Sequence, residues 1–201
     1  MDSLVCVKLA LIEDVNIIVN IHSDAFKEFF LTSLGEDFLR FYYSCFIKSN
    51  DGRVFCAIYG GRIVGFAAMA EKSKGFNARM VKNNIFLFGL MSLKMLFTSP
   101  MSLLRLIRNL KKTSSNVDDE DYAELFSIGV IKSAQGLGVG KRLLCAVEDY
   151  VRSQGKSRLS LTTDYYDNDS AISFYRTMHY HEMYDFIAFP NRRMYRFVKE
   201  L

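Results

Sequence analysis

The feature that most constrains this chain is the glycine-rich stretch QGLGVGKRLL at 135–144. It follows an apolar run typical of a strand at 123–131 and opens an amphipathic stretch that reaches about Ser153. The sequence therefore predicts a strand, a glycine loop and a helix in succession. Such a junction points backbone N–H groups and the positive end of a helix dipole outward, which favours a bound anion. A glycine turn with solvated bases explains this stretch equally well when it is taken alone.

Two common phosphate-binding loops do not fit the spacing of this stretch. A Walker loop needs glycine at 135 and serine or threonine at 142, where the chain has Gln135 and Arg142. A dinucleotide-binding fingerprint needs glycine at 141, where Lys141 stands. Lys141 and Arg142 also place positive charge at a helix start, against the dipole, and this local cost is understandable if an anion binds there.

Hydrophobic periodicity predicts the order of the remaining elements. Gly60 and Gly61 tolerate positive φ and suit a tight turn between two strands. The expected elements are a strand at 5–10, helices around 15–25 and 38–46, hairpin strands at 53–59 and 62–70, helical residues at 76–112 broken near Ser99 and Pro100, a strand at 123–131, a helix to about Ser153, a strand at 157–163, a helix at 168–178 with Asn168 or Asp169 as its N-cap, and a strand pair at 181–189 and 192–200.

The composition fits one domain over residues 1–201. Half of the 201 residues are apolar, which is enough for one sizeable core, and two prolines without a low-complexity tract leave little room for a linker. The apolar stretch at 85–97 is short for a membrane span and contains Lys94, so a transmembrane helix is not expected.

The cysteines predict a reduced, cytoplasmic protein with buried thiols. They lie far apart in apolar surroundings, no pair has metal-ligand spacing, and no basic segment with a leader-like run opens the chain. We therefore expect neither a metal nor a disulfide at the four positions Cys6, Cys45, Cys56 and Cys145.

Charge is unevenly distributed along the chain. Residues 71–112 hold nine lysines and arginines and one acid, so this segment carries +8 and the rest of the chain −4, and an acidic run at 118–121 follows. Within the segment, MSLLRLIRNLKK at 101–112 has the pattern of a basic amphipathic helix. Such a face attracts an anionic small molecule or acidic lipid. A helix packed on its own core with solvated bases explains the pattern equally well.

Two stretches of the sequence carry a resemblance to a known family. QGLGVG at 135–140 matches the Q/R-x-x-G-x-G/A signature of the GNAT acetyltransferase superfamily, and NDSAISFY at 168–175 resembles the family's N-x-x-A-x-x-F-Y helix. The order of the first strand, its two helices and the following hairpin also resembles that of the family. The resemblance covers nearly the whole chain except 72–119, which is interpreted as a helical insertion between strands three and four. It implies an α/β fold, the GNAT acyltransferase fold, with a central mixed, mostly antiparallel sheet flanked by helices on both faces.

The resemblance implies an acetyl-CoA site beside the fourth strand. In the family the pantetheine arm lies between splayed fourth and fifth strands, which here would pair it with the backbone of Ile128 and Val130, and Asn168 would face the coenzyme. Glycine matters in the loop because a Cβ would hold the backbone away from the phosphate oxygens. The pyrophosphate would be wrapped by Gln135, Gly136, Gly138, Val139, Gly140 and Lys141.

The resemblance also implies two catalytic side chains. An ammonium must lose a proton before its nitrogen can attack a thioester. Glu124 lies fourteen residues before Gly138, the interval at which GNAT enzymes often carry the glutamate that accepts this proton directly or through water. Tyr175 occupies the family position that points at the sulfur and assists the departing thiolate. A glutamate on the wet face of a strand and a core aromatic are the alternatives for these two residues.

The histidines show no motif and are interpreted as surface or structural residues: His22, His179 and His181. The family usually has glycine after the second motif helix, but here His179 precedes Tyr180. The C-terminus of this helix must therefore use a non-glycine residue.

The acceptor is expected to be a primary amine, such as an amino sugar or a nucleotide-linked amino sugar. The stretch 29–43 and the long basic insertion resemble a GNAT branch associated with bacterial surface-polysaccharide enzymes that act on amino sugars. The alternatives are an acetyltransferase for a small polyamine or amino acid, and a non-catalytic acyl-CoA-binding module. A peripheral membrane contact through the insertion and a homodimer remain open. Nucleic acid is not expected, because no aromatic platform is interleaved with the bases.

Overall fold

A seven-stranded mixed sheet forms the centre of the computed structural model, which describes residues 4–27, 29–98, 100–101, 104, 121–188 and 190–201. Its strands, in the spatial order β1-β2-β3-β4-β5-β7-β6, are β1 (Cys6–Leu9), β2 (Gly52–Tyr59), β3 (Arg62–Ala70), β4 (Ala123–Val130), β5 (Arg158–Asp164), β6 (His181–Ala188) and β7 (Arg192–Glu200). The helices are α1 (Val15–Ala25), α2 (Phe30–Ser33), α3 (Glu36–Lys48), α4 (Phe76–Asn83), α5 (Ile85–Thr98), α7 (Val139–Ser153) and α8 (Asp169–Thr177), with 3-10 turns η1 (Ile12–Asp14) and η2 (Lys132–Ala134).

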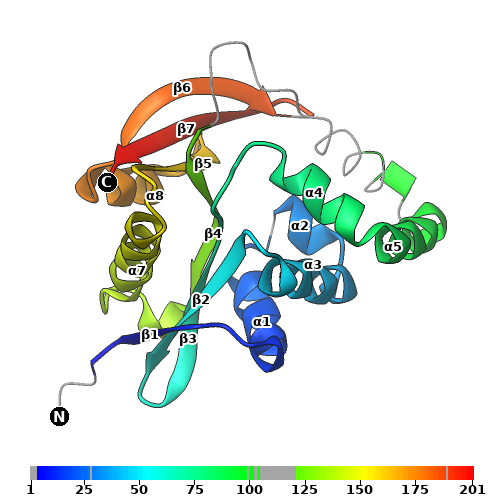
Figure 1. Cartoon of the computed structure of the whole chain (residues 1–201), viewed down its shortest axis with the longest axis horizontal. Helices are drawn as coiled ribbons and strands as arrows, with labels where there is room; N and C mark the ends of the chain where they lie inside the picture. Colours follow the sequence, from blue (N-terminus) through cyan, green and yellow to red (C-terminus); the bar gives the residue numbers. More distant parts are fainter. Residues whose placement is uncertain (1–3, 28, 99, 102–103, 105–120, 189) are drawn as a thin grey trace.

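Helices cover both faces of the sheet, as Figure 1 shows. Along β3, Phe66 and Ala68 belong to the core under α1 and α3, whereas Ala67 and Met69 belong to the core under α7 and α8. Because both faces are buried, the strand reads as a continuous apolar run instead of alternating with polar residues. The predicted fold class is confirmed, and β4 and β5 are the parallel pair in an otherwise antiparallel sheet.

The start of α7 is held against β3 by a close approach at Gly65. A Cβ on Gly65 would lie 2.9 Å from the Gly129 carbonyl oxygen and 3.1 Å from a methyl carbon of Val139, distances at which something must shift. Glycine at this position therefore fixes where α7 begins. The hairpin between β2 and β3 likewise turns through Gly60 and Gly61, with the predicted positive φ of 57° and 76°.

The insertion between β3 and β4 begins with α4 and α5. The predicted break near Ser99 and Pro100 involves Ser99, which lies outside the described residues. The sequence missed an earlier break at Asn84, between α4 and α5. The Asn84 side chain donates a hydrogen bond to the Met80 carbonyl oxygen at 2.9 Å, and asparagine competes in this way with the helical backbone pattern. Most of the basic stretch predicted as a helix at 101–112 lies outside the described residues.

The C-terminus of α8 ends in a Schellman motif built on His179. His179 has a φ of 66°, the Tyr180 N–H donates to the Tyr175 carbonyl at 3.0 Å, and the His179 N–H donates to the Arg176 carbonyl at 2.9 Å. The predicted use of a non-glycine residue at this terminus is confirmed. The motif fixes the backbone of Tyr175.

Replacing His179 with glycine should stabilise the protein by about 1 kcal/mol, because glycine adopts the left-handed conformation without the Cβ clash. Urea unfolding of His179→Gly measures this change. The matched control is His181→Gly in the extended strand β6, which should be destabilising. An equal effect of the two substitutions would contradict the explanation.

The cysteines are free and differ in exposure. Cys45 and Cys56 are buried, Cys145 is half-buried and Cys6 is exposed, so the expectation of buried thiols is wrong for Cys6, which lies on the edge strand β1. Burial raises the pKa of Cys45 to about 11 and that of Cys56 to about 12. Within the described ranges, no three His, Cys, Asp or Glu side chains gather into a metal-binding group, and no helix has the length and apolar content that a membrane crossing needs.

Candidate active site

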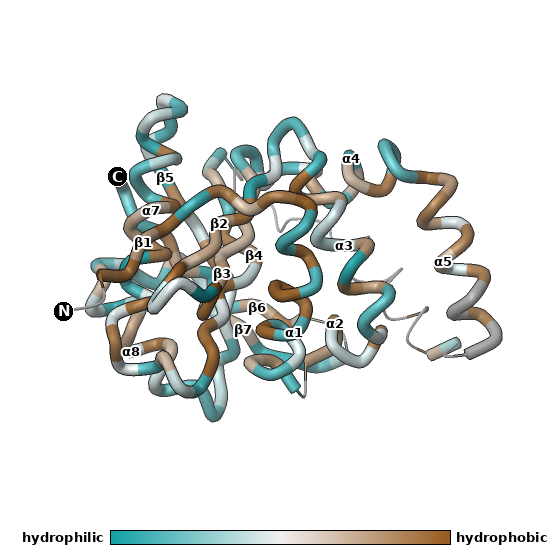
Figure 2. Tube along the Cα trace, turned by 90° about the horizontal axis from the view of Figure 1, so that it is seen from below, coloured by the Kyte–Doolittle hydropathy of each residue, from teal (hydrophilic) through white to brown (hydrophobic). Residues whose placement is uncertain are grey.

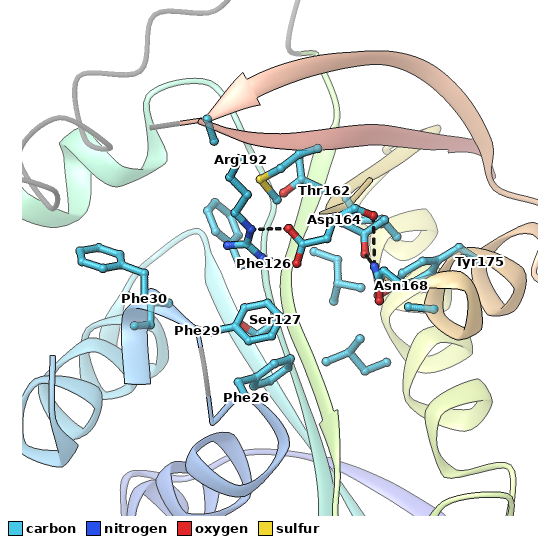
Figure 3. A pocket seen from close by; sticks show the side chains of 18 of the residues that line it. Phe26, Phe29, Phe30, Phe126, Ser127, Thr162, Asp164, Asn168, Tyr175 and Arg192 are labelled. Carbon is cyan, nitrogen blue, oxygen red and sulfur yellow. Dashed lines mark hydrogen bonds and ion pairs between the residues drawn. The ribbon is translucent and has the colours of Figure 1, made fainter. Parts of the chain in front are cut away.

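The sheet splits between its two parallel strands. β4 and β5 pair through three residue pairs, Ala123 with Leu159, Glu124 with Ser160 and Leu125 with Leu161, and the pairing then stops although both strands continue. A pocket of about 380 Å³ opens at this point, lined by residues 125–128 of β4 and 161–164 of β5. Figure 3 shows the pocket from close by. Two strands that diverge in this way leave backbone groups on their facing edges available to a ligand.

One wall of the pocket comes from α8. Asn168 and Tyr175, two helical turns apart on one face of α8, both line it. Asn168 is the N-cap residue of α8, but its side-chain N–H donates to Thr163 Oγ1 at 2.5 Å and to the Asp164 carbonyl at 3.3 Å instead of capping the helix. This pair of bonds ties α8 to the free end of β5.

Tyr175 contributes a hydroxyl to this wall, beside the Asn168 amide. The residue is 8% exposed, and its burial raises the pKa of the hydroxyl well above its usual range, so it stays protonated. Within the described part of the chain, no hydrogen bond of this hydroxyl is found. Tyr175 is therefore a neutral hydrogen-bond donor at the pocket.

The opposite wall is aromatic and comes from the end of α1 and the start of α2. It includes Phe26, Phe29 and Phe30, which Figure 3 shows across the pocket from Asn168 and Tyr175. The Phe26 and Phe29 rings meet edge to face, with centroids 5.2 Å apart. The two walls thus offer different chemistry, one a hydroxyl and an amide, the other apolar rings.

An ion pair joins the two walls at the rim. The Arg192 guanidinium of β7 binds both carboxylate oxygens of Asp164 on β5, and it also lies over the Phe29 ring, 4.8 Å from the centroid. Sequence reasoning missed this pair, since the two residues lie 28 positions apart in the chain. Among the described lining residues, Asp164 is the one carboxylate, and its charge is already matched.

His22 is a second residue that sequence reasoning left without a function at the site. It lines the aromatic side of the pocket and is 2% exposed, whereas His179 and His181 are exposed. Its Nδ1 lies 2.6 Å from the Tyr43 hydroxyl, and its Nε2 has no hydrogen-bond partner in the described part of the structure. Burial lowers the pKa of His22 to about 4, so the ring is neutral near pH 7.

The lowered pKa of His22 predicts how stability changes with pH. The unfolded state binds a proton near the ordinary value of 6.5 and the folded state only near 4, so stability is complete above 6.5 and falls as the pH drops toward 4. Between about pH 7 and about pH 5 this residue should account for a loss of about 2 kcal/mol. Urea unfolding at both pH values measures it, and His22→Asn should lose less stability over this interval than the wild type. Equal losses would contradict the assignment.

The glycine loop lies beyond the open end of the split. Gly136 and Gly138 have φ of 79° and 75°, and a Cβ on either would meet no atom within 4 Å, so their backbone faces open space. α7 begins directly after Gly138, and its first turn contains no acid. Lys141 and Arg142 are exposed and form no ion pair within the described residues. The loop therefore combines backbone that faces open space, a helix start and two positive charges without an ion pair among the described residues, which suits an anion.

Some of the predicted site residues line the pocket, and others lie outside it. Ile128, Asn168 and Tyr175 line the pocket, whereas Val130, the loop 135–141 and Glu124 do not. Val130 lies between the pocket and the loop, and its carbonyl accepts a hydrogen bond from the Gln135 side chain at 3.4 Å.

Glu124 lies at the closed end of the split, within its last paired residues. One carboxylate oxygen accepts a hydrogen bond from Arg196 Nη1 at 2.5 Å, and the other accepts one from the Ser73 hydroxyl. Both side chains of the ion pair are largely buried, with 7% of Arg196 and 12% of Glu124 exposed. Glu124 is thus a largely enclosed carboxylate, and each of its two oxygens accepts one hydrogen bond from a side chain.

A sheet that opens between two parallel strands, with a glycine loop and a helix start that suit an anion beside the opening, is the arrangement of an acyltransferase that takes its acyl group from coenzyme A. The chain belongs to the acetyltransferase (GNAT) family, whose sequence profile matches residues 15–180. The resemblance seen in the two motifs is confirmed, and with it the acyltransferase class. Members of this family generally use acetyl-CoA.

Individual proteins are similar to this chain either over a short segment or at low sequence identity. A segment of 55 residues is 38% identical to the mycothiol acetyltransferase of Renibacterium salmoninarum and covers 27% of this chain and 16% of that protein. The chain thus matches about a sixth of the length of this curated relative. An N-acetyltransferase from Staphylococcus aureus Mu50 superposes with a TM-score of 0.63 at 15% identity, over 98% of this chain and 99% of that one.

A ribosomal-protein-alanine N-acetyltransferase from Brucella melitensis gives a TM-score of 0.63 at 16% identity, again over 98% of this chain and 99% of that one. At this identity, the two superpositions show a shared fold.

Proposed function

We propose that this protein transfers the acetyl group of acetyl-CoA to a primary amine by direct attack on the thioester through a tetrahedral intermediate. The observation that carries the proposal is the end of β4–β5 pairing after Leu125 and Leu161, which opens a pocket with two different walls. An amine entering from the aromatic wall would meet the thioester carbonyl between the strands. The thiolate would leave toward Tyr175.

The coenzyme would lie along the split with its pyrophosphate on the glycine loop. Gln135, Gly136, Gly138, Val139, Gly140 and Lys141 are the residues proposed to hold it, and the backbone of Ile128 and Val130 is proposed to pair with the pantetheine arm. Three features support this placement: the open space beside the left-handed glycines, the helix start, and two exposed bases without an ion pair in the described ranges. Phosphate oxygens can approach such a backbone because no Cβ intervenes.

The proton of the amine needs an acceptor, and Glu124 is the proposed one. Glu124 lies on β4 at the closed end of the split, and β4 and β5 continue from there to border the pocket. Its two hydrogen bonds, to Arg196 and Ser73, mean that a water or a change of partner must connect it to the amine. His22, whose Nε2 is unpartnered in the described residues at the same pocket, is the second basic group that could receive this proton.

The aromatic wall supports an acceptor with an apolar face, such as an amino sugar or a nucleotide-linked amino sugar. Phe26, Phe29 and Phe30 can pack against the C–H face of a sugar ring. A polyamine fits less well, because a chain of ammonium groups needs unpaired carboxylates and Asp164 is already bound by Arg192.

A screen of amines tests the proposed function. Purified protein is mixed with acetyl-CoA and free amino sugars, nucleotide-linked amino sugars, polyamines, amino acids or short peptides, and released thiol is measured. We expect release above the hydrolytic background, greatest with an amino sugar. Greatest release with spermidine would overturn the acceptor class, and coenzyme binding without release for any amine would indicate a non-catalytic binding module.

A further inference from the structure

Among the described side chains of the insertion helix α5, Phe88 is buried, whereas most of the other apolar ones are exposed. Phe88 is 6% exposed and packs on Phe41 of α3 with ring centroids 4.7 Å apart. Six other apolar side chains, here called the outer face of α5, are between 47% and 80% exposed: Ile85, Phe86, Leu87, Leu90, Leu93 and Leu96. A helix that is apolar all round is normally buried all round, so this outer face calls for a partner.

The position of α5 leaves this face accessible. Figures 1 and 2 both show α5 at one end of the molecule, beyond α3 and α4 and away from the sheet, and Figure 2 colours most of the helix as hydrophobic. The apolar surface continues past the end of α5, where Met101 is 76% exposed and Leu104 is 40% exposed.

The charge of this segment favours an anionic surface over a second copy of the chain as the partner of this face. The segment 71–112, which contains α5, carries nine bases and one acid. Lys82, three residues before α5 begins, is exposed and has no ion pair within the described part of the chain. Lys72 and Lys74 are also exposed, but they flank Ser73, which is bonded to Glu124 of β4. A closed dimer would bring the same patch of two copies together and place this positive charge against itself. An anionic surface would instead be attracted.

We propose that the outer face of α5 inserts into the surface of a membrane that contains anionic lipid, with the helix lying in the interface. With 14 residues α5 is too short to span a bilayer, which takes about 20. A helix with exposed leucine and phenylalanine beside lysines suits the boundary between head groups and acyl chains. The apolar side chains provide the insertion energy, and the bases provide the preference for anionic lipid.

Vesicle sedimentation tests the proposal on the full-length protein. The wild type should bind vesicles of phosphatidylcholine with phosphatidylglycerol and remain in solution with phosphatidylcholine alone. Leu90→Glu combined with Leu93→Glu should weaken binding by about a hundredfold, because two inserted leucines are lost and negative charge is added. Raising salt should weaken wild-type binding, since its electrostatic part is screened over about 10 Å at 0.1 M.

A matched control uses an exposed leucine on another part of the surface. Leu11→Glu, at a residue that is 52% exposed, should bind the anionic vesicles as the wild type does. Circular dichroism and coenzyme binding should be unchanged in the Leu90 and Leu93 double variant, since both residues are exposed.

Three results would overturn the proposal. They are a wild type that stays in solution with anionic vesicles, a double variant that binds as well as the wild type, and a wild-type dimer that the double variant dissociates in light scattering. The last result would make this face an interface between two copies of the chain.

Discussion

Gly138→Glu is expected to lower the affinity for coenzyme A by at least about a hundredfold while the fold survives. A Cβ on Gly138 would meet no atom within 4 Å, so the side chain can leave the backbone without a clash. The same open space is where the pyrophosphate is proposed to bind, and the glutamate would add both volume and like charge there. A carboxylate beside a helix N-terminus does not weaken the helix. Titration calorimetry with coenzyme A measures the change.

Gly138→Ala is the control for backbone strain at this position. It imposes the same cost of a non-glycine residue at a φ of 75°, about 1 kcal/mol, without the length or charge of glutamate. Affinity that falls much further in the glutamate variant than in the alanine variant would locate the pyrophosphate at the loop. Unchanged affinity in a folded Gly138→Glu protein would exclude that location.

Tyr175→Phe is expected to lower turnover by roughly ten- to ten-thousand-fold with little change in acetyl-CoA binding. The hydroxyl is protonated and faces a pocket in which a thiolate would form. A phenol whose pKa is raised by burial is a weaker acid than a thiol, so it would stabilise the leaving thiolate by a hydrogen bond instead of full proton transfer. This contribution exists in the transition state and is absent from ground-state binding.

Tyr180→Phe separates this effect from the loss of any buried hydroxyl. Tyr180 is also buried, but its hydroxyl donates to Glu148 and does not line the pocket. We expect this control to lose stability and keep its turnover. If Tyr175→Phe retains wild-type turnover with chemistry shown to be rate-limiting, Tyr175 is a core aromatic and not a catalytic residue.

The order of elements could be predicted from the sequence because its signals are local. Alternating and 3.6-residue periods, the glycine pair at 60–61 and the glycine loop each act within a few residues. The break at Asn84 was missed because an apolar helical period continues across it, while the competing hydrogen bond depends on the asparagine side chain.

The polar partners at the site could not be predicted, because they join distant parts of the chain. Glu124 and Arg196 lie 72 positions apart, and no local pattern reports such a pair. His22 did leave a signal. The buried residues of α1 include Val15, Ile18 and Val19, and His22 continues this stripe at helical spacing. A histidine in the buried stripe of a helix indicates an internal polar contact, here with Tyr43.

The two walls beside the β4–β5 split come from distant parts of the sequence. The aromatic wall comes from residues 22–31, whereas Asn168 and Tyr175 come from a helix more than a hundred residues later, and three residue pairs join the two half-sheets at the closed end. Substitutions in the early segment can therefore reshape the room for the acceptor without moving the groups proposed to act on the thioester. The proposed acceptor room and the groups proposed to act on the thioester are thus encoded in different parts of the sequence, and the contact of Arg192 with the Phe29 ring links them in the folded protein.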